Sequence, residues 1–237
     1  MTAAHALGAA LALLVAPAAA HADPWHLTLS GGTDFPISAG ARLDVEGPAR
    51  LRLSTAVGAM PDAYVSAINS LATAAGWYSD SEAALIRTAL HSSLVWRTHL
   101  GWRPFSRLGF TVMAGYGLVA LGGGASAQEL IAGITGQTIP PGTTTGSYTY
   151  SVSSTLHMID VELGWEWTFF RNRLVLSASL GFAGTVASRT TIRPEYTPRA
   201  PQAVAQFANY GATYLDNLMT SSVFTPVIGL GVGYRFF

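Results

Sequence analysis

The sequence predicts an all-β fold: a transmembrane, antiparallel, up-and-down β-barrel of eight strands with short helices in its long extracellular loops. Three observations predict it. Hydrophobic residues make up 49% of the 237 residues and charged residues only 11%, against roughly 25% charged in an ordinary soluble domain. Eight segments show period-two alternation of apolar and polar residues. Short and long connections alternate between these segments.

The first 22 residues have the pattern of a secretory signal peptide. An apolar stretch from Ala6 to Val15 is followed by Ala20-His21-Ala22, which matches an A-x-A cleavage site. The alternative is an N-terminal transmembrane anchor, but the apolar run is shorter than the roughly 20 residues that a spanning helix needs. We therefore expect residues 1–22 to be a signal peptide and residues 23–237 to form an outer-membrane β-barrel domain.

The last segment of the chain shows the alternation best. One face carries large apolar side chains, and the other carries mainly glycine with threonine, valine and Arg235. The apolar face consists of Phe224, Pro226, Ile228, Leu230, Val232, Tyr234 and Phe236. The same division recurs in seven earlier segments, which are His26–Ser30, Ile37–Glu46, Arg50–Val57, Leu94–Arg103, Arg107–Leu118, Ile159–Phe169 and Leu174–Ala183.

The connections indicate which way the apolar face points. Tight turns at 47–48, 103–106 and 170–173 alternate with long connections at 61–90, 121–147 and 189–221, and only the first outer loop, 32–36, is short. Bacterial outer-membrane barrels have short periplasmic turns and long extracellular loops. The pattern predicts a protein of the bacterial outer membrane with periplasmic termini, extracellular long loops and a lipid-facing apolar surface.

Aromatic residues on the apolar face gather near the short turns. Their amphipathic rings favour the depth of the lipid headgroups, so we expect a periplasmic aromatic girdle. Its members are Trp25, Trp102, Trp165, Trp167, Phe169, Tyr234 and Phe236.

Charged residues lie at mid-strand on the opposite face. An eight-stranded barrel encloses a lumen that side chains fill, and buried charges are costly unless they are paired. We therefore expect a lumenal charge network and a closed interior. Its members are Arg42, Asp44, Arg52, Arg97, Asp160 and Glu162.

The ending Gly229-Leu230-Gly231-Val232-Gly233-Tyr234-Arg235-Phe236-Phe237 resembles the closing strand of small outer-membrane barrels of the OmpA and OmpX type. The resemblance covers the strands from about Trp25 to Phe237. It implies that the barrel-assembly machinery recognises the terminal aromatic residue. In this chain the alternation places Phe236 on the lipid face and Phe237 out of register. The matching motifs are architectural and carry no catalytic residues.

The long connections contain helix-like apolar spacing in four ranges, 63–72, 81–90, 125–134 and 201–219. These helices either pack over the barrel mouth or form a surface for a partner or for lipid. The segment 137–147, rich in proline and threonine, is interpreted as a loop tip.

No residue pattern supports an enzyme, a cofactor or a metal site. Ser153 and His157 share the lipid-facing parity but stand about 13 Å apart along one strand, and His26 and His99 are expected to be solitary lumenal residues. The 13 basic residues balance 13 acidic ones, so a nucleic-acid partner is not expected. The expected partners are outer-membrane lipid and the assembly machinery, with no extracellular partner identified. A non-enzymatic surface protein is the leading hypothesis; a narrow channel for small solutes and a lipid-modifying outer-membrane enzyme are the alternatives.

Overall fold

The computed structural model describes residues 25–74, 92–105, 107–135 and 148–237. The predicted signal peptide at 1–22, the predicted helix at 81–90 and the loop tip at 137–147 lie outside the described residues. Among the described residues no helix has both the length and the apolar character needed to span a membrane.

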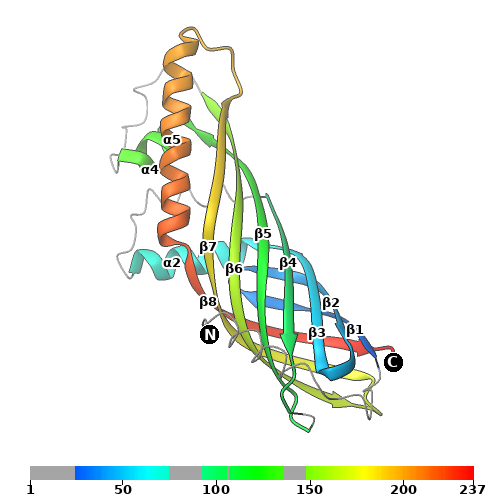
Figure 1. Ribbon diagram of the computed structural model, residues 1–237. Coiled ribbons are helices and arrows are strands. Elements are labelled where there is room, and N and C mark those ends of the chain that lie inside the picture. The colour runs from blue at the N-terminus through cyan, green and yellow to red at the C-terminus, as the bar shows by residue number, and fades with distance from the viewer. Residues whose placement is uncertain (1–24, 75–91, 106, 136–147) are drawn as a thin grey trace, which may run out of the picture.

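The eight strands form a closed antiparallel barrel in which each strand pairs with its neighbours in sequence and β8 closes on β1 (Figure 1). The predicted strand number and up-and-down order are confirmed. The strands are β1 (His26–Phe35), β2 (Ser38–Glu46), β3 (Leu51–Ala59), β4 (Ser92–Trp102), β5 (Phe110–Ser126), β6 (Thr149–Phe169), β7 (Leu174–Pro194) and β8 (Phe224–Arg235). A short 3-10 turn, η1 (Pro48–Arg50), joins β2 to β3.

The two faces of the barrel wall have inverted polarity relative to a soluble protein. Leu100 and Leu230 on the outside are 65% and 58% exposed, whereas Arg97 and Glu162 on the inside are 2% and 0% exposed. If this exterior faced water, it would expose a continuous apolar band, which folded soluble proteins avoid. The exterior is therefore that of a lipid-facing barrel, as predicted from the alternating short and long connections.

Strands β5, β6 and β7 are longer than expected. β6 and β7 have 21 residues each and β5 has 17, although a strand needs only about 9–11 residues to cross a bilayer. Their outer ends rise above the barrel as a three-stranded sheet that we call the wing (Figure 1). β6 starts at Thr149, well before the alternating segment Ile159–Phe169 named from the sequence and directly after the predicted long connection at 121–147.

The apolar and polar faces of β6 change sides close to His157. Below this level, toward Phe169, the outside is apolar and the inside is charged; above it the outside carries Ser151, Ser153 and Thr155, and the inside carries apolar side chains. A β-bulge in β7 lies opposite this point, between the pairs His157–Ala187 and Met158–Thr185. The extra residue, Val186, shifts the alternation of β7 by one position.

Three helices of the described chain cover the outer end, as the sequence predicted at 63–72, 125–134 and 201–219. They are α2 (Asp62–Ala74), α4 (Ala127–Thr135) and α5 (Pro201–Ser222). With 22 residues, α5 is longer than the short helix expected, and it runs along β7 (Figure 1). Ser188 Oγ donates a hydrogen bond to Asp216 Oδ1 at 2.9 Å, which ties α5 to the strand.

Two apolar clusters lie on the inner side of the outer half. The first, the mouth cluster, fills the barrel opening with side chains from the wall, from α2 and from α5. It consists of Ile37, Val65, Val95, Val119, Leu121, Leu156, Met158, Ala183, Met219 and Val227. Ile37 was expected on the lipid face, but it precedes the start of β2 and is only 4% exposed within this cluster.

The second apolar group, the wing cluster, joins the inner face of the wing to α4 and α5. It consists of Ala125, Leu130, Tyr150, Val152, Ile192, Ala208 and Leu215. A sheet face packed against a helix needs apolar residues on its helix side, which explains why the inner face of β6 turns apolar above Met158.

Candidate functional site

Arg97 lies at the centre of the lumen, where β4 aims its side chain across the barrel. Its Nη1 donates to Asp34 Oδ2 at 2.9 Å and its Nη2 donates to Asp160 Oδ2 at 3.0 Å. The same Nη2 also makes a close ion pair with Glu162. One buried guanidinium therefore serves three carboxylates from β1 and β6.

Arg42 of β2 completes this group from the opposite wall. Its Nη2 donates to Asp34 Oδ2 at 2.8 Å, and its Nη1 lies 3.7 Å from Glu162 Oε2. Asp34 was not among the lumenal residues predicted from the sequence, because it was expected in the first outer loop. β1 instead continues to Phe35, and the alternation from Thr28 would have placed Asp34 on the inner face.

His99 is fully buried and is not solitary, which corrects the expectation from the sequence. Its Nε2 lies 2.7 Å from Asp160 Oδ1 and 3.2 Å from Arg97 Nη2. We call these six residues, Asp34, Arg42, Arg97, His99, Asp160 and Glu162, the central cluster. It has three carboxylates, two guanidiniums and one imidazole.

Part of the central cluster has the spacing of a metal site. One ligand atom each from His99, Asp160 and Glu162 lies within 4.8 Å of the others, and all three residues are buried. Arg97 Nη2 bonds both carboxylates, however, so a guanidinium already supplies the positive charge that a metal ion would bring. The donor set fits an ion-pair network better than a metal centre.

A second group, the rim cluster, lies nearer the short turns. Arg52 Nη2 pairs with Asp44 at 3.0 Å, and Arg52 Nη1 makes a close pair with Glu166. The other members are Glu46, Arg103 and Arg235. Arg103 Nη2 lies 2.8 Å from Glu46 Oε2 and 2.6 Å from Glu166 Oε2, and Arg235 Nη2 lies 3.4 Å from the same Glu166 oxygen.

The six lumenal residues named from the sequence thus fall into two groups. Arg42, Arg97, Asp160 and Glu162 come together in the central cluster, whereas Arg52 and Asp44 pair in the rim cluster. Glu166 accepts from three arginines and was missed, although it shares the inner parity of Glu162 on β6. His26 was expected inside the lumen; its Nδ1 lies 3.0 Å from the Phe237 carbonyl oxygen at the rim.

Little open space remains beside the central cluster. Glycine and serine residues of β1, β2, β7 and β8 leave a cavity of about 40 Å³ next to Asp34 and Arg42. This volume suffices for two or three water molecules. Above it the mouth cluster is apolar. The lumen is therefore filled by ion pairs at one level and by apolar side chains at the level above it.

The seven predicted girdle residues are all on the exterior, with exposed fractions between 42% for Trp165 and 58% for Trp25. Phe105 and Phe110 join them: Phe110 lies 6.3 Å from Phe105 and 5.2 Å from Trp165 between ring centroids. A second aromatic group lies at the level where β6 changes polarity. There Trp96 Nε1 donates to Thr55 Oγ1 at 3.1 Å, and the Tyr116 hydroxyl shares a hydrogen bond with His157 Nδ1.

The two aromatic groups bound the apolar band, as headgroup-depth residues do in membrane barrels. The contact between His157 and Tyr116 also bears on the hydrolase alternative. A serine nucleophile needs a base within hydrogen-bond reach, and the His157 ring is engaged by a tyrosine from β5 and not by Ser153.

No protein-family model and no curated protein sequence matches this chain. Among solved structures it is similar to a major outer membrane protein from Thermus thermophilus, with 13% identity, a TM-score of 0.42 and coverage of 90% of this chain and 98% of that one. The N-terminal β-barrel domain of Pseudomonas aeruginosa OprF shows 10% identity and a TM-score of 0.40, covering 91% of this chain and 100% of that one.

Acinetobacter baumannii CarO2 shows 12% identity and a TM-score of 0.44, again covering 91% of this chain and 100% of that one. At these values the likeness transfers no ligand and no role to this chain. What the protein does has to be inferred from its own surfaces and interior.

Replacing Glu162 by alanine is expected to lower the free energy of unfolding by about 1–3 kcal/mol without opening a conductance. The change removes the carboxylate that Arg97 and Arg42 share, but it leaves two carboxylates for two guanidiniums. Thermal unfolding of the refolded barrel, followed by the loss of its heat-modifiable band, measures the first effect. A large steady pore in the variant that the unmodified protein lacks would contradict the filled lumen.

Proposed function

We propose that the chain is an integral protein of the bacterial outer membrane with a filled lumen. In this proposal the short-turn rim and both termini are periplasmic, and the protein acts non-enzymatically at the cell surface through its outer structure. The exterior apolar band between two aromatic groups supports the membrane placement. The wing, α4 and α5 support the surface role, because they form an ordered structure beyond the band on a rigid scaffold.

The observation that carries the closed-lumen proposal is the presence of two separate barriers in series. Arg97 and its carboxylate partners cross the barrel at mid-height. Above them, α2 and α5 insert Val65 and Met219 into the mouth cluster. α2 is anchored to β1, since the rings of Phe35 and Tyr64 lie 5.1 Å apart and the Tyr64 hydroxyl bonds Thr33.

A narrow channel for small polar solutes is the second candidate. The cavity of about 40 Å³ beside Asp34 favours it, because glycine and serine of four adjacent strands leave that side of the lumen without bulky side chains. Conduction would require α2 and α5 to leave the mouth, since Val65 and Met219 lie across the exit on the outer side.

The closing strand supports a biogenesis partner. Phe236 N donates to Leu27 O at 2.9 Å, and its ring is 45% exposed on the lipid side. The proposal includes recognition of this terminal aromatic residue by the barrel-assembly machinery.

The test is gel mobility of the refolded, unboiled protein beside a boiled sample, followed by planar-bilayer conductance of the same preparation. A heat-modifiable band without conductance is the expected result, because a paired barrel resists unfolding in detergent and its lumen is blocked twice. Steady small currents would favour the channel. Absence of a heat-modifiable band would contradict the membrane barrel.

A further inference from the structure

The barrel wall has a gap at its short-turn rim between β5 and β6. Within the described residues, the last hydrogen bond between these strands runs from Glu166 N to Gly109 O at 2.9 Å. β6 continues to Phe169, but in the same part of the chain the segment from Trp167 to Phe169 pairs with β7 alone. In the described part of the chain, Trp167 and Thr168 therefore have no paired strand on the β5 side.

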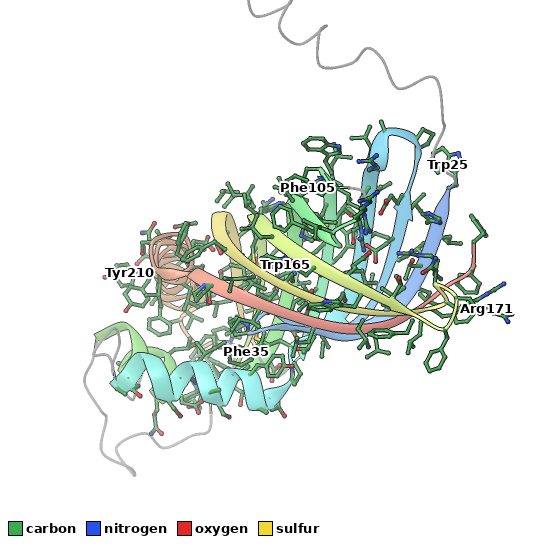
Figure 2. The ribbon with its side chains drawn as sticks, turned by 90° about the horizontal axis from the view of Figure 1, so that it is seen from below. Trp25, Phe35, Phe105, Trp165, Arg171 and Tyr210 are labelled. Atoms are coloured by element: carbon green, nitrogen blue, oxygen red, sulfur yellow. The ribbon has the colours of Figure 1, made fainter. Side chains whose placement is uncertain are left out.

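An aromatic recess of about 670 Å³ lies on the outside of this gap. Exterior rings line it together with the inner-face residues Glu166 and Thr168, so the recess reaches around the free edge of β6. The rings are those of Phe105, Phe110, Trp165, Trp167 and Phe169. Both Phe105 and Trp165, labelled in Figure 2, are exposed.

A polar vestibule of about 310 Å³ lies on the lumenal side of the same gap and shares Arg107, Gly109, Glu166 and Thr168 with the recess. Four arginines line the vestibule, at positions 50, 103, 107 and 235, and its two carboxylates are Glu46 and Glu166. Both carboxylates already pair with guanidiniums of the rim cluster. More guanidiniums than carboxylates therefore line the vestibule.

Arg107 is the arginine that lines both spaces. It is exposed, lines both, and makes no side-chain hydrogen bond or ion pair within the described part of the chain. Guanidinium groups bind phosphate oxygens in a bidentate manner. An unpaired arginine beside apolar rings therefore suits a ligand that is anionic at one end and apolar at the other.

We infer that this gap holds one anionic phospholipid of the periplasmic leaflet, with its phosphate on Arg107 at the vestibule and its glycerol and upper acyl chains in the aromatic recess. The inference rests on the proposed membrane placement, which sets the rim at headgroup depth. Charge complementarity and the continuity of the two spaces select a lipid over a soluble anion, which would have no use for the recess.

Arg171 provides a matched control. It is an exposed arginine in the neighbouring short turn at the same rim, it likewise makes no side-chain ion pair or hydrogen bond in the described structure, and it lines neither space. Figure 2 shows it at the tip of its turn, pointing away from the barrel. An unspecific attraction of anionic headgroups to the rim would act on both arginines alike.

The experiment counts lipids retained by the folded protein. The full chain is reconstituted in nanodiscs of equal parts phosphatidylcholine and phosphatidylglycerol, released into neutral detergent, and examined by native mass spectrometry. The unmodified protein and R171Q are expected to retain one phosphatidylglycerol. R107Q is expected to bind it about fivefold more weakly, and Phe105→Ser, which removes a ring from the recess, is expected to lower retention as well.

Equal retention by R107Q and R171Q would overturn the inference. Displacement of the retained lipid by inorganic phosphate at constant ionic strength would also overturn it, because the site would then bind a free anion and not specifically a lipid. The heat-modifiable band of each sample separates the two proposals: a folded band without a retained lipid rejects only the lipid site, whereas no folded band rejects the membrane barrel itself.

Discussion

Replacing Arg97 by methionine is expected to lower the free energy of unfolding by about 3–5 kcal/mol. The substitution keeps an unbranched apolar stem but removes the guanidinium that Asp34, Asp160 and Glu162 share. Three buried carboxylates would then face Arg42 alone, and an uncompensated buried charge is far more costly than the loss of one contact. Urea-induced unfolding in lipid vesicles, followed by tryptophan fluorescence, measures the change.

Arg189→Gln is the control for Arg97. Arg189 is an exposed arginine on the outer face of β7 with no side-chain ion pair in the described structure, and its loss is expected to change the free energy of unfolding by less than about 0.5 kcal/mol. Adding Asp160→Asn and Glu162→Gln to the Arg97 variant is expected to recover part of the stability. Equal effects of the Arg97 and Arg189 variants would contradict the central role of the cluster.

Replacing Leu215 by aspartate is expected to release α5 from the wing at a local cost of about 3–5 kcal/mol. Leu215 is only 3% exposed within the wing cluster, so the variant loses apolar packing and buries an unpaired carboxylate. The barrel below depends on its own hydrogen-bonded ladder and its interior ion pairs. We therefore expect limited proteolysis to cut α5 while the heat-modifiable band persists.

Tyr210→Asp is the matched substitution on the same helix. Its side chain is 66% exposed, and Figure 2 shows it on the side of α5 that points away from the barrel. It should leave the protease resistance of α5 unchanged. Cleavage of both variants at the same rate would indicate that α5 is not held by the wing cluster, and it would weaken the proposal that the outer structure is an ordered functional surface.

Inward and outward faces were predictable because side-chain parity is a local property. Once one residue of a strand is placed, every second residue shares its side. Leu230 and Leu100 on the lipid side, Arg97 and Glu162 on the lumenal side, and all seven girdle rings follow from this rule. The three helices of the described chain were predictable for a similar reason, since their apolar spacing is periodic over two or more turns.

Partners across the lumen were not predictable in the same way, because they depend on strand stagger and tilt. Asp34 and Arg97 are separated by 63 residues and meet only when the barrel closes. Glu166 gathers three arginines from β3, the β4–β5 connection and β8 for the same reason. Parity alone places Glu166 inside the barrel but assigns no partner to it.

Local alternation, together with the order of short and long connections, thus decided the barrel class, the lipid-facing surface and the residues available to fill the lumen. The tertiary structure decided the height of the wing, because an apolar inner face above Met158 has meaning only once α5 lies against it. It also decided the division of the lumenal charges into two clusters and the gap beside Gly109. The face of a strand on which a residue lies is set by its neighbours in sequence. The residues that it contacts there belong to segments distant in the sequence, which only folding brings together.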